Sequence, residues 1–149
     1  MIVPVGLLPY LQDVTYSGDE MRPDKVEAFM QEFESLTQPA GMNRVLSRYG
    51  QYGVFGLTPD LHSGDVNLDI IMAWDKGIGN GSIALQWLLS LADKHGVDIR
   101  GRIERQGDDG LSTVELRRWY KRHGFKVDRQ LYMRREASTN KPNGRMKDA

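Results

Sequence analysis

The chain has 149 residues, enough for one domain with a buried core, and its 40% hydrophobic and 27% charged residues are typical of a globular protein. The absence of cysteine excludes disulfides, thiolate nucleophiles and Cys-ligated zinc, and three widely spaced histidines give no metal-ligand signature. No apolar run reaches membrane-spanning length and the first residues lack the features of a signal peptide, so the expected location is the cytoplasm.

The net charge is zero, but the charges are unevenly distributed along the chain. Residues 1–75 carry 4 basic and 11 acidic side chains, whereas residues 76–149 carry 16 basic and 9 acidic ones. The C-terminal half would therefore attract a polyanionic ligand, unless these charges are simply solvated.

The first half of the chain contains one clear element, an amphipathic helix over residues 24–36. Pro23 is favourable beside a helix start, and residues 38–41 read Gln-Pro-Ala-Gly, which ends helices. Apolar side chains recur at helical spacing in between, at Val26, Phe29, Met30, Phe33 and Leu36. Before this helix, residues 2–5 are compatible with an edge strand, because Pro4 disfavours a central one.

Two strands follow, over residues 52–58 and 66–74, and a polar turn over residues 59–65 joins them as a hairpin. Residues 43–49 fit a short helix and a strand equally well. Alternation in the second strand predicts one face with Val66, Leu68, Ile70 and Met72, and another with Asn67, Asp69, Ile71 and Ala73.

A glycine-rich stretch, residues 75–82, separates the second strand from an apolar-periodic helix over residues 82–94. Glycine lacks a Cβ atom and reaches positive φ without strain, so the stretch can turn several backbone N–H groups toward one point. The first N–H groups of a helix lack intrahelical acceptors and lie at the positive end of the helix dipole. The pattern therefore indicates a pyrophosphate cradle, with the Ser82 hydroxyl as a further donor. The alternative is a tight turn that binds nothing.

Two known phosphate-binding motifs do not fit this stretch. The Walker motif needs Lys after the glycines and before Ser or Thr, whereas Lys76 precedes them. A dinucleotide fingerprint follows the first strand of a βαβ unit, with an acidic residue about 20 positions later. Here the glycines lie in mid-chain, and an isolated acid such as Asp98 gives that interpretation little support.

The helix over residues 82–94 ends at Gly96, a typical helix C-cap, and a strand over residues 97–105 follows. Because strand, helix and strand succeed one another, the unit should be a right-handed parallel crossover.

Ser112 and Glu115 form a capping box for a further helix, which ends at residues 123–124. One or two strands over residues 125–133 close the sheet. Residues 138–149 are polar and expected to be disordered, which leaves residues 1–137 as a single α/β domain.

Two motifs at a fixed separation resemble those of the GNAT superfamily of acyl-CoA-dependent N-acyltransferases. The first motif has the pattern Gln/Arg-x-x-Gly-x-Gly/Ala and lies at the start of a helix. Lys76, Gly79 and Gly81 occupy its three defined positions, and Lys76 departs from the usual Gln or Arg. The second is a Tyr three residues before Gly-Phe, which Tyr120 matches. The frequent Asn seven residues before this Tyr is Thr113 here. The resemblance covers residues 66–135, and residues 1–65 show none.

The resemblance implies a GNAT-type mixed sheet with splayed central strands, flanking helices and acetyl-CoA in the gap. The pantetheine would pair with the backbone of Ile71, Met72 and Ala73, and the Ile71 N–H would polarise the thioester carbonyl. The pyrophosphate would lie on the glycine loop and helix start, formed by Lys76, Gly77, Ile78, Gly79, Asn80, Gly81 and Ser82. No metal is implied.

For catalysis, the resemblance places a general acid at Tyr120, whose phenol would protonate the CoA thiolate. The alternative is a packed aromatic at a helix end. An amine acceptor also needs a base, and the candidates are Asp69 and Glu104, either of which could instead be a solvated strand carboxylate. His62 in the hairpin turn is a weaker candidate.

The predicted function is transfer of an acetyl or short acyl group from CoA to a primary amine. The acceptor could be a small molecule, a protein amine or a modified nucleobase, and dimers are common in the family. One alternative is a GNAT-like module that binds CoA or a protein without turnover. Another is a nucleic-acid-binding module, suggested by a basic surface and disfavoured by the zero net charge; the surface consists of Arg117, Arg118, Lys121, Arg122, Lys126 and Arg129.

Overall fold

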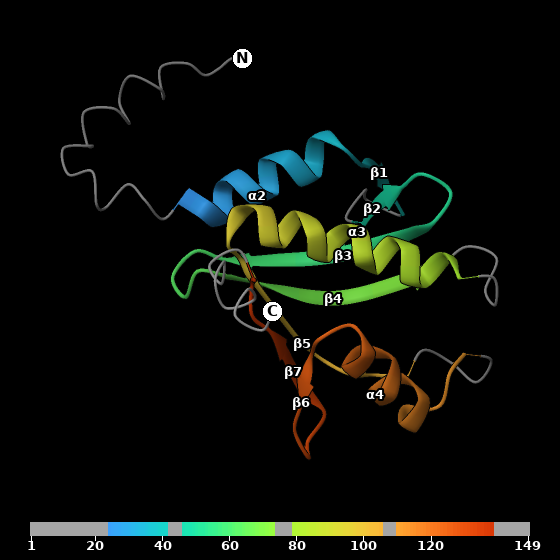
Figure 1. The fold of residues 1–149 in the computed structure, drawn as a ribbon. Coiled ribbons are helices and arrows are strands. Elements are labelled where there is room, and N and C mark those ends of the chain that lie inside the picture. Colours follow the sequence, from blue (N-terminus) through green and yellow to red (C-terminus); the bar gives the residue numbers. More distant parts are fainter. Residues whose placement is uncertain (1–23, 42–45, 74–78, 106–109, 139–149) are drawn as a thin grey trace, which may run out of the picture.

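The computed structural model describes residues 24–41, 46–73, 79–105 and 110–138. They form a seven-stranded mixed sheet in the order β1-β2-β3-β4-β5-β7-β6, with three helices packed around it (Figure 1). The elements are α2 (Asp24–Ser35), β1 (Gln38–Ala40), β2 (Leu46–Tyr49), β3 (Gly53–Asp60), β4 (Asp65–Ala73), α3 (Asn80–His95), β5 (Asp98–Arg102), α4 (Thr113–Arg122), β6 (Lys126–Val127) and β7 (Tyr132–Arg135). The α/β class is confirmed. The expected edge strand at residues 2–5 and residues 139–149 of the expected tail at 138–149 lie outside the described residues.

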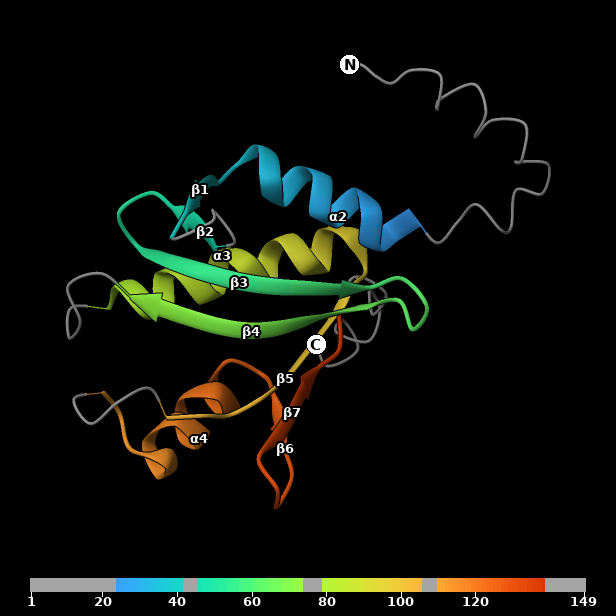
Figure 2. The same cartoon turned by 180° about the vertical axis from the view of Figure 1, so that it is seen from behind.

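Helices α2 and α3 lie side by side over β3 and β4, as both views show (Figures 1 and 2). The periodicity that predicted α2 places Phe29 and Phe33 in the core, where both are almost fully buried. Phe33 meets Phe55 of β3 edge to face, and Trp87 of α3 packs against both. Burial of such aromatic side chains is a large part of what holds the two layers together.

The segment that ends α2 is itself a strand. Residues 38–40 pair antiparallel with β2 at the edge of the sheet, so the expectation of a simple helix stop was incomplete. Pro39 lacks an N–H donor, and an edge strand tolerates this because one of its sides has no partner. Pairing with β3 also resolves residues 46–49 as a strand.

The β3–β4 hairpin is longer than predicted and contains an irregularity. The strands extend to Asp60 and from Asp65, so the turn is shorter than residues 59–65. Gly56 pairs with Ile70 but Leu57 with Leu68, which leaves Asp69 as the extra residue of a β-bulge.

The bulge makes the predicted faces of β4 wrong beyond Asp69. Ile71 pairs with the buried Phe55 and packs against the core, so it shares a face with Leu68. Ile70 pairs with Gly56 on the opposite face of the sheet. An extra residue shifts the alternation by one position, which turns every later side chain to the other face.

Strands β4 and β5 pair in parallel, but only over a short distance. The pairs run from Asp65–Asp98 to Leu68–Gly101, and none of the described strands pairs with this side of β4 over residues 69–73. Strand β5 continues along β7 instead, and the N–H of Ile103 donates to the carbonyl of Leu131. The predicted parallel crossover and the splay of the central strands are therefore both present, with the split after Leu68 and Gly101.

Helix α4 begins as the sequence predicts. The Ser112 hydroxyl accepts a hydrogen bond from the N–H of Glu115, and the Glu115 carboxylate accepts one from the N–H of Ser112. Phe125, just beyond the helix, is buried and packs against Tyr120. This contact fixes the last turn of α4 against the sheet where β6 begins.

Candidate functional site

The open edge of β4 lies over residues 69–73, beyond the split from β5. Ile71 is half-buried on the core side, Met72 is exposed on the other face, and Ala73 ends the strand. Backbone N–H and C=O groups on an unpaired strand edge can accept a further extended segment, as in β-augmentation. The three residues predicted to hold the pantetheine therefore lie where such a ligand could pair.

The amino-terminal end of α3 lies next to the end of β4. A Cβ atom built on Gly81 would be 3.4 Å from the Cβ of Ala73. Gly79 is the N-cap residue with φ 88°, a conformation that favours glycine, and no side chain caps the helix. The N–H of Ile83 is bonded to the carbonyl of Gly79, so the helix bonds begin only there.

This geometry suits an anion at the helix start. The preceding N–H groups, those of Asn80, Gly81 and Ser82, have no acceptor within the helix and lie at the positive end of its dipole. The helix begins two residues earlier than predicted, so Ser82 belongs to its first turn and is not its cap. Lys76, Gly77 and Ile78, which the sequence also assigns to the cradle, lie outside the described residues.

Helix α4 reaches this end of α3 through Trp119. The indole Nε1–H donates a hydrogen bond of 3.0 Å to the Ser82 hydroxyl oxygen. The Trp119 ring also lies 3.6 Å from the position that a Gly81 Cβ would occupy. The sequence analysis gave no reason to single out Trp119. Its link to Ser82 leaves the hydroxyl proton of Ser82 available for another acceptor.

Tyr120, the predicted general acid, follows Trp119 and is 7% exposed. Its ring meets those of Trp119 and Phe125 edge to face. Burial raises the pKa of the Tyr120 phenol to about 12, so the group stays protonated at neutral pH. Among the residues that the structure describes, no group makes a hydrogen bond with this hydroxyl. A buried polar group without a partner is costly, and such groups concentrate where a ligand supplies the missing bond.

The two candidate bases lie on different strands. Asp69 occupies the bulge of β4, is exposed, and accepts hydrogen bonds from the Thr58 hydroxyl at 2.6 Å and from the Asn67 amide. Glu104 lies just beyond β5, is exposed, and is 3.6 Å from the guanidinium of Arg102. The structure therefore places Asp69 on β4 and Glu104 just after β5, and the two carboxylates are not in contact with each other.

His62 lies in the turn that precedes β4, and its N–H donates to Asp60. The nine residues of β4 separate this turn from Ala73. At about 3.3 Å per residue the separation is about 25 Å, so His62 is not positioned to act as a base at the open end.

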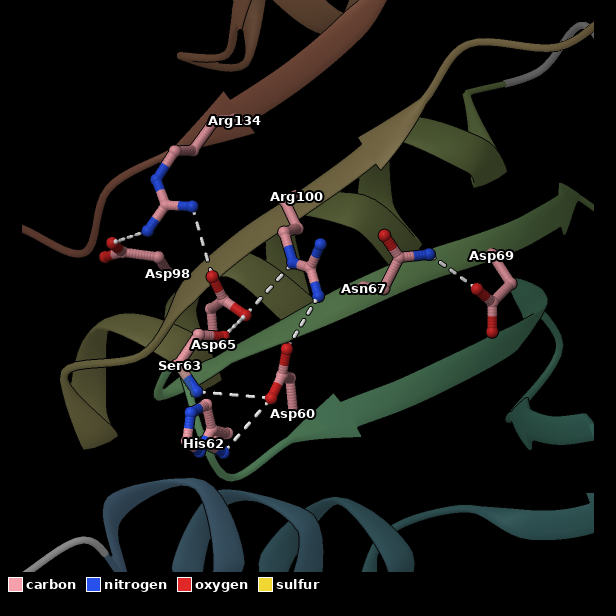
Figure 3. A network of polar contacts seen from close by, with 9 residues as sticks. All are labelled: Asp60, His62, Ser63, Asp65, Asn67, Asp69, Asp98, Arg100 and Arg134. Atoms are coloured by element: carbon pink, nitrogen blue, oxygen red, sulfur yellow. Dashed lines mark hydrogen bonds and ion pairs between the residues drawn. The ribbon is translucent and has the colours of Figure 1, made fainter.

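A network of carboxylates and guanidiniums holds the closed end of the split (Figure 3). Asp65, which is 3% exposed, accepts hydrogen bonds from Arg100 of β5 at 3.0 Å and from Arg134 of β7 at 3.1 Å. Asp60 and Asp98 accept the remaining bonds of these two arginines. The sequence analysis did not single out this network, because its members come from three separate segments of the chain and each resembles an ordinary charged strand residue.

The network also sets the ionisation of Asp65. Burial raises the pKa of this carboxyl, but hydrogen bonds from Ser63, Arg134 and Arg100 outweigh burial, and the net pKa lies below the ordinary value. Asp65 therefore stays ionised between the two arginines at neutral pH and ties β4, β5 and β7 together where the pairing of β4 with β5 begins.

Across the described ranges, no helix is long and apolar enough to span a membrane, and no three acidic or histidine side chains are grouped as metal ligands.

No family model and no curated protein matches the chain. Among solved structures, the chain is similar to the crystal structure of the anti-CRISPR protein AcrVA5. The sequence identity is 22% and the TM-score 0.47, and the match covers 55% of this chain and 87% of the other. A similarity of this size does not indicate what this chain does. The mixed sheet with splayed central strands that the sequence resemblance implies is seen in the chain's own strand pairing, with its parallel crossover and the split after Leu68 and Gly101.

Proposed function

We propose that the chain is an acyl-CoA-dependent N-acyltransferase of GNAT type, which transfers an acetyl or short acyl group to a primary amine. The observation that carries the proposal is the split between β4 and β5 after Leu68 and Gly101, which opens beside the uncapped start of α3. An open strand edge next to a helix amino terminus that no side chain caps suits a ligand that has an amide-rich arm and a pyrophosphate. Acyl-CoA has this chemistry.

In this proposal the donor binds along β4 and across the start of α3. Its pantetheine amides pair with the backbone of residues 71–73, and its pyrophosphate accepts hydrogen bonds from the N–H groups of residues 80–82. The glycine loop at residues 76–78 completes the cradle. Trp119 holds the Ser82 side chain in place while the serine hydroxyl proton remains free to reach the phosphate.

In the reaction, the neutral amine attacks the thioester carbonyl, and the C–N bond forms as the oxygen becomes an oxyanion. The Ile71 N–H stabilises this oxyanion. Collapse of the intermediate breaks the C–S bond, and the thiolate takes a proton from Tyr120, which later regains one from solvent. The amine nitrogen loses its proton to a base, so the products are an amide and free CoA.

Tyr120 suits the acid role because burial keeps its phenol protonated and leaves its hydroxyl without a partner among the described residues. We assign the base to Asp69 in preference to Glu104. Asp69 is on the same strand as Ile71, two residues away, and the Thr58 and Asn67 hydrogen bonds orient its carboxylate. Glu104 follows the far strand and has no such support.

The test is a pair of measurements on the full chain. Titration calorimetry with acetyl-CoA should show binding, and dephosphorylated fragments that lack the pyrophosphate should bind far more weakly. An assay for free thiol with a panel of amines should then show amine-dependent CoA release. Binding without release would favour a non-catalytic CoA-binding module. Absence of binding to any CoA species would contradict both.

A further inference from the structure

A shallow groove of about 280 Å³ lies on the sheet face opposite α2 and α3, over β5 and β7 and beside β4. The polar and aromatic side chains that line it are Asn67, Arg100, Arg102, Tyr132 and Arg134. Its volume is close to the lower limit for small-molecule sites, so it fits a compact ligand. Arg102, Tyr132 and Arg134 are all exposed there, while α2 and α3 cover the sheet over β3 and β4 (Figures 1 and 2).

The three arginines of the groove are not equivalent. Arg100 and Arg134 each donate to two carboxylates, which neutralise them at the closed end of the split (Figure 3). Arg102 makes no hydrogen bond among the described residues, and its one ion pair there, with Glu104 at 3.6 Å, is longer than a hydrogen bond. Its guanidinium therefore keeps its donors available.

Arg102 is also held in position. Its guanidinium carbon lies 5.5 Å from the centre of the Tyr132 ring, directly across the β5–β7 pair. Stacking on an aromatic ring orients the guanidinium plane without using its N–H donors. Such an arrangement binds a carboxylate or phosphate at a smaller entropic cost than a freely rotating side chain.

Arg102 and Asp69 flank the start of the split. Leu68 and Gly101 are the last pair of β4 and β5, and Asp69 and Arg102 are the next residues on the two strands. Asp69 is bonded to Asn67, which lines the groove, so both charges are presented on the groove side. A cationic and an anionic group thus stand on opposite sides of the opening through which a thioester would be reached.

From this juxtaposition we propose that the acceptor is a small amine that also carries a carboxylate or phosphate. The anionic group would bind Arg102, and the amine would lie against Asp69, facing the gap. This inference rests on the proposed function, because it names the substrate class of the same site. Polyamines, which carry only positive charge, would be disfavoured by Arg102.

The test uses amines matched in all but the anionic group. We would measure thiol release with 4-aminobutyrate against butylamine, and with O-phosphoethanolamine against ethanolamine, so that a carboxylate and a phosphate are examined separately. The anionic member of at least one pair should have a kcat/KM about 10- to 100-fold higher. Arg102→Gln should abolish this preference mainly through KM, Arg102→Lys should retain part of it, and thermal unfolding should show that both variants fold.

Lys25→Gln is the matched control, because it removes one exposed positive charge from α2, away from the groove. It should leave the preference unchanged. This inference would be overturned if thiol release were equal for both members of each pair and did not change in Arg102→Gln. The proposed acyltransferase activity would not be affected by that result.

Absence of thiol release with every amine would instead overturn the proposed function. Binding would then decide the inference, through nuclear magnetic resonance of the Arg102 Nε–H during titration with O-phosphoethanolamine and with 4-aminobutyrate. A saturable shift that Arg102→Gln abolishes supports an anion site at Arg102. No shift with either compound overturns it.

Discussion

The Trp119 indole donates a 3.0 Å hydrogen bond to the Ser82 hydroxyl, and this contact joins the last turns of α4 to the first turn of α3. The two residues are far apart in the chain, yet they lie where the open strand edge, the helix amino terminus and Tyr120 converge. Both side chains are half-buried, so water competes only partly for the bond. The contact fixes how α4 is presented to the candidate donor site.

We expect Trp119→Phe and Ser82→Ala to be coupled in stability. Each variant breaks the same hydrogen bond, so the double variant should be less destabilised than the sum of the two single variants. The coupling should be about 0.5–1.5 kcal/mol, measured by urea unfolding in a double-mutant cycle. Additive effects would show that the bond contributes nothing to the junction.

Tyr120→Phe separates the role of the phenol in catalysis from its role in packing. The ring contacts with Trp119 and Phe125 remain, and the lost hydroxyl has no hydrogen-bond partner among the described residues. The free energy of unfolding should therefore stay within about 0.5 kcal/mol of the parent value or rise. Thiol release should fall by about 10²- to 10⁴-fold. Unchanged turnover would remove Tyr120 from the mechanism.

The same variant should alter stability at alkaline pH. Burial raises the pKa of Tyr120 to about 12, above the ordinary value near 10. The folded state thus holds this proton more tightly than the unfolded state, and the resulting stability is complete below about pH 10 and is lost as the pH rises toward 12. Tyr120→Phe should show a shallower loss of stability over this interval, measured by denaturant unfolding at each pH.

Gly79→Ala tests the helix start as a phosphate site. Gly79 has φ 88° and an added Cβ would meet nothing within 4 Å, so the cost should be conformational, about 1–2 kcal/mol of stability. Gly96 caps the other end of α3 with φ 72°, which makes Gly96→Ala a matched control. Both should destabilise the fold similarly, but only Gly79→Ala should weaken acetyl-CoA binding in calorimetry. Equal affinities would contradict the cradle.

Asp69→Asn and Glu104→Gln distinguish the candidate bases. Both carboxylates are exposed, so neither change should cost more than about 0.5 kcal/mol of stability. If Asp69 accepts the amine proton, Asp69→Asn should lower kcat by about 10²-fold or more and Glu104→Gln should not. The reverse result would move the base to Glu104, and two unaffected variants would leave proton removal to solvent.

The sequence predicted those parts of the fold that local signals determine. The periodicity of α2 and α3, the capping box of α4 and the hairpin all appear in the structure because each depends on neighbouring residues. Gln38–Ala40 was missed as a strand because its pairing with β2, not its own composition, makes it one. Local propensity carries no information on such tertiary pairing.

The candidate site was predictable only in part. The β4 bulge escaped the sequence because Ile70 and Ile71 are both apolar, so neither alternation is favoured after Asp69. The predicted faces of β4 are therefore the reverse of the observed ones from Ile70 to Ala73. Motifs with fixed spacing made Tyr120 and the helix start candidates, whereas Trp119 and Arg102 depend on contacts between distant segments and became candidates only in the folded chain.

Asp65→Asn should reveal how much the closed end of the split depends on one carboxylate. The variant leaves Arg100 and Arg134 facing a neutral amide, and the loss of two charge-assisted hydrogen bonds should cost about 2–3 kcal/mol at pH 7. Glu34→Gln, which removes an exposed charge from α2, is the control and should have little effect.

The dependence of this cost on pH distinguishes ionic from packing effects. The pKa of Asp65 lies below its ordinary value of 3.8 in the folded state, so acid protonates the unfolded chain first. The stabilisation is therefore present above about pH 4 and is lost as the pH falls through the lower folded pKa. The difference between parent and Asp65→Asn in urea unfolding should shrink as the pH falls from 5 toward 3. A difference that stays constant over this range would mean that Asp65 acts through packing, and that its charge does not hold β4, β5 and β7 together.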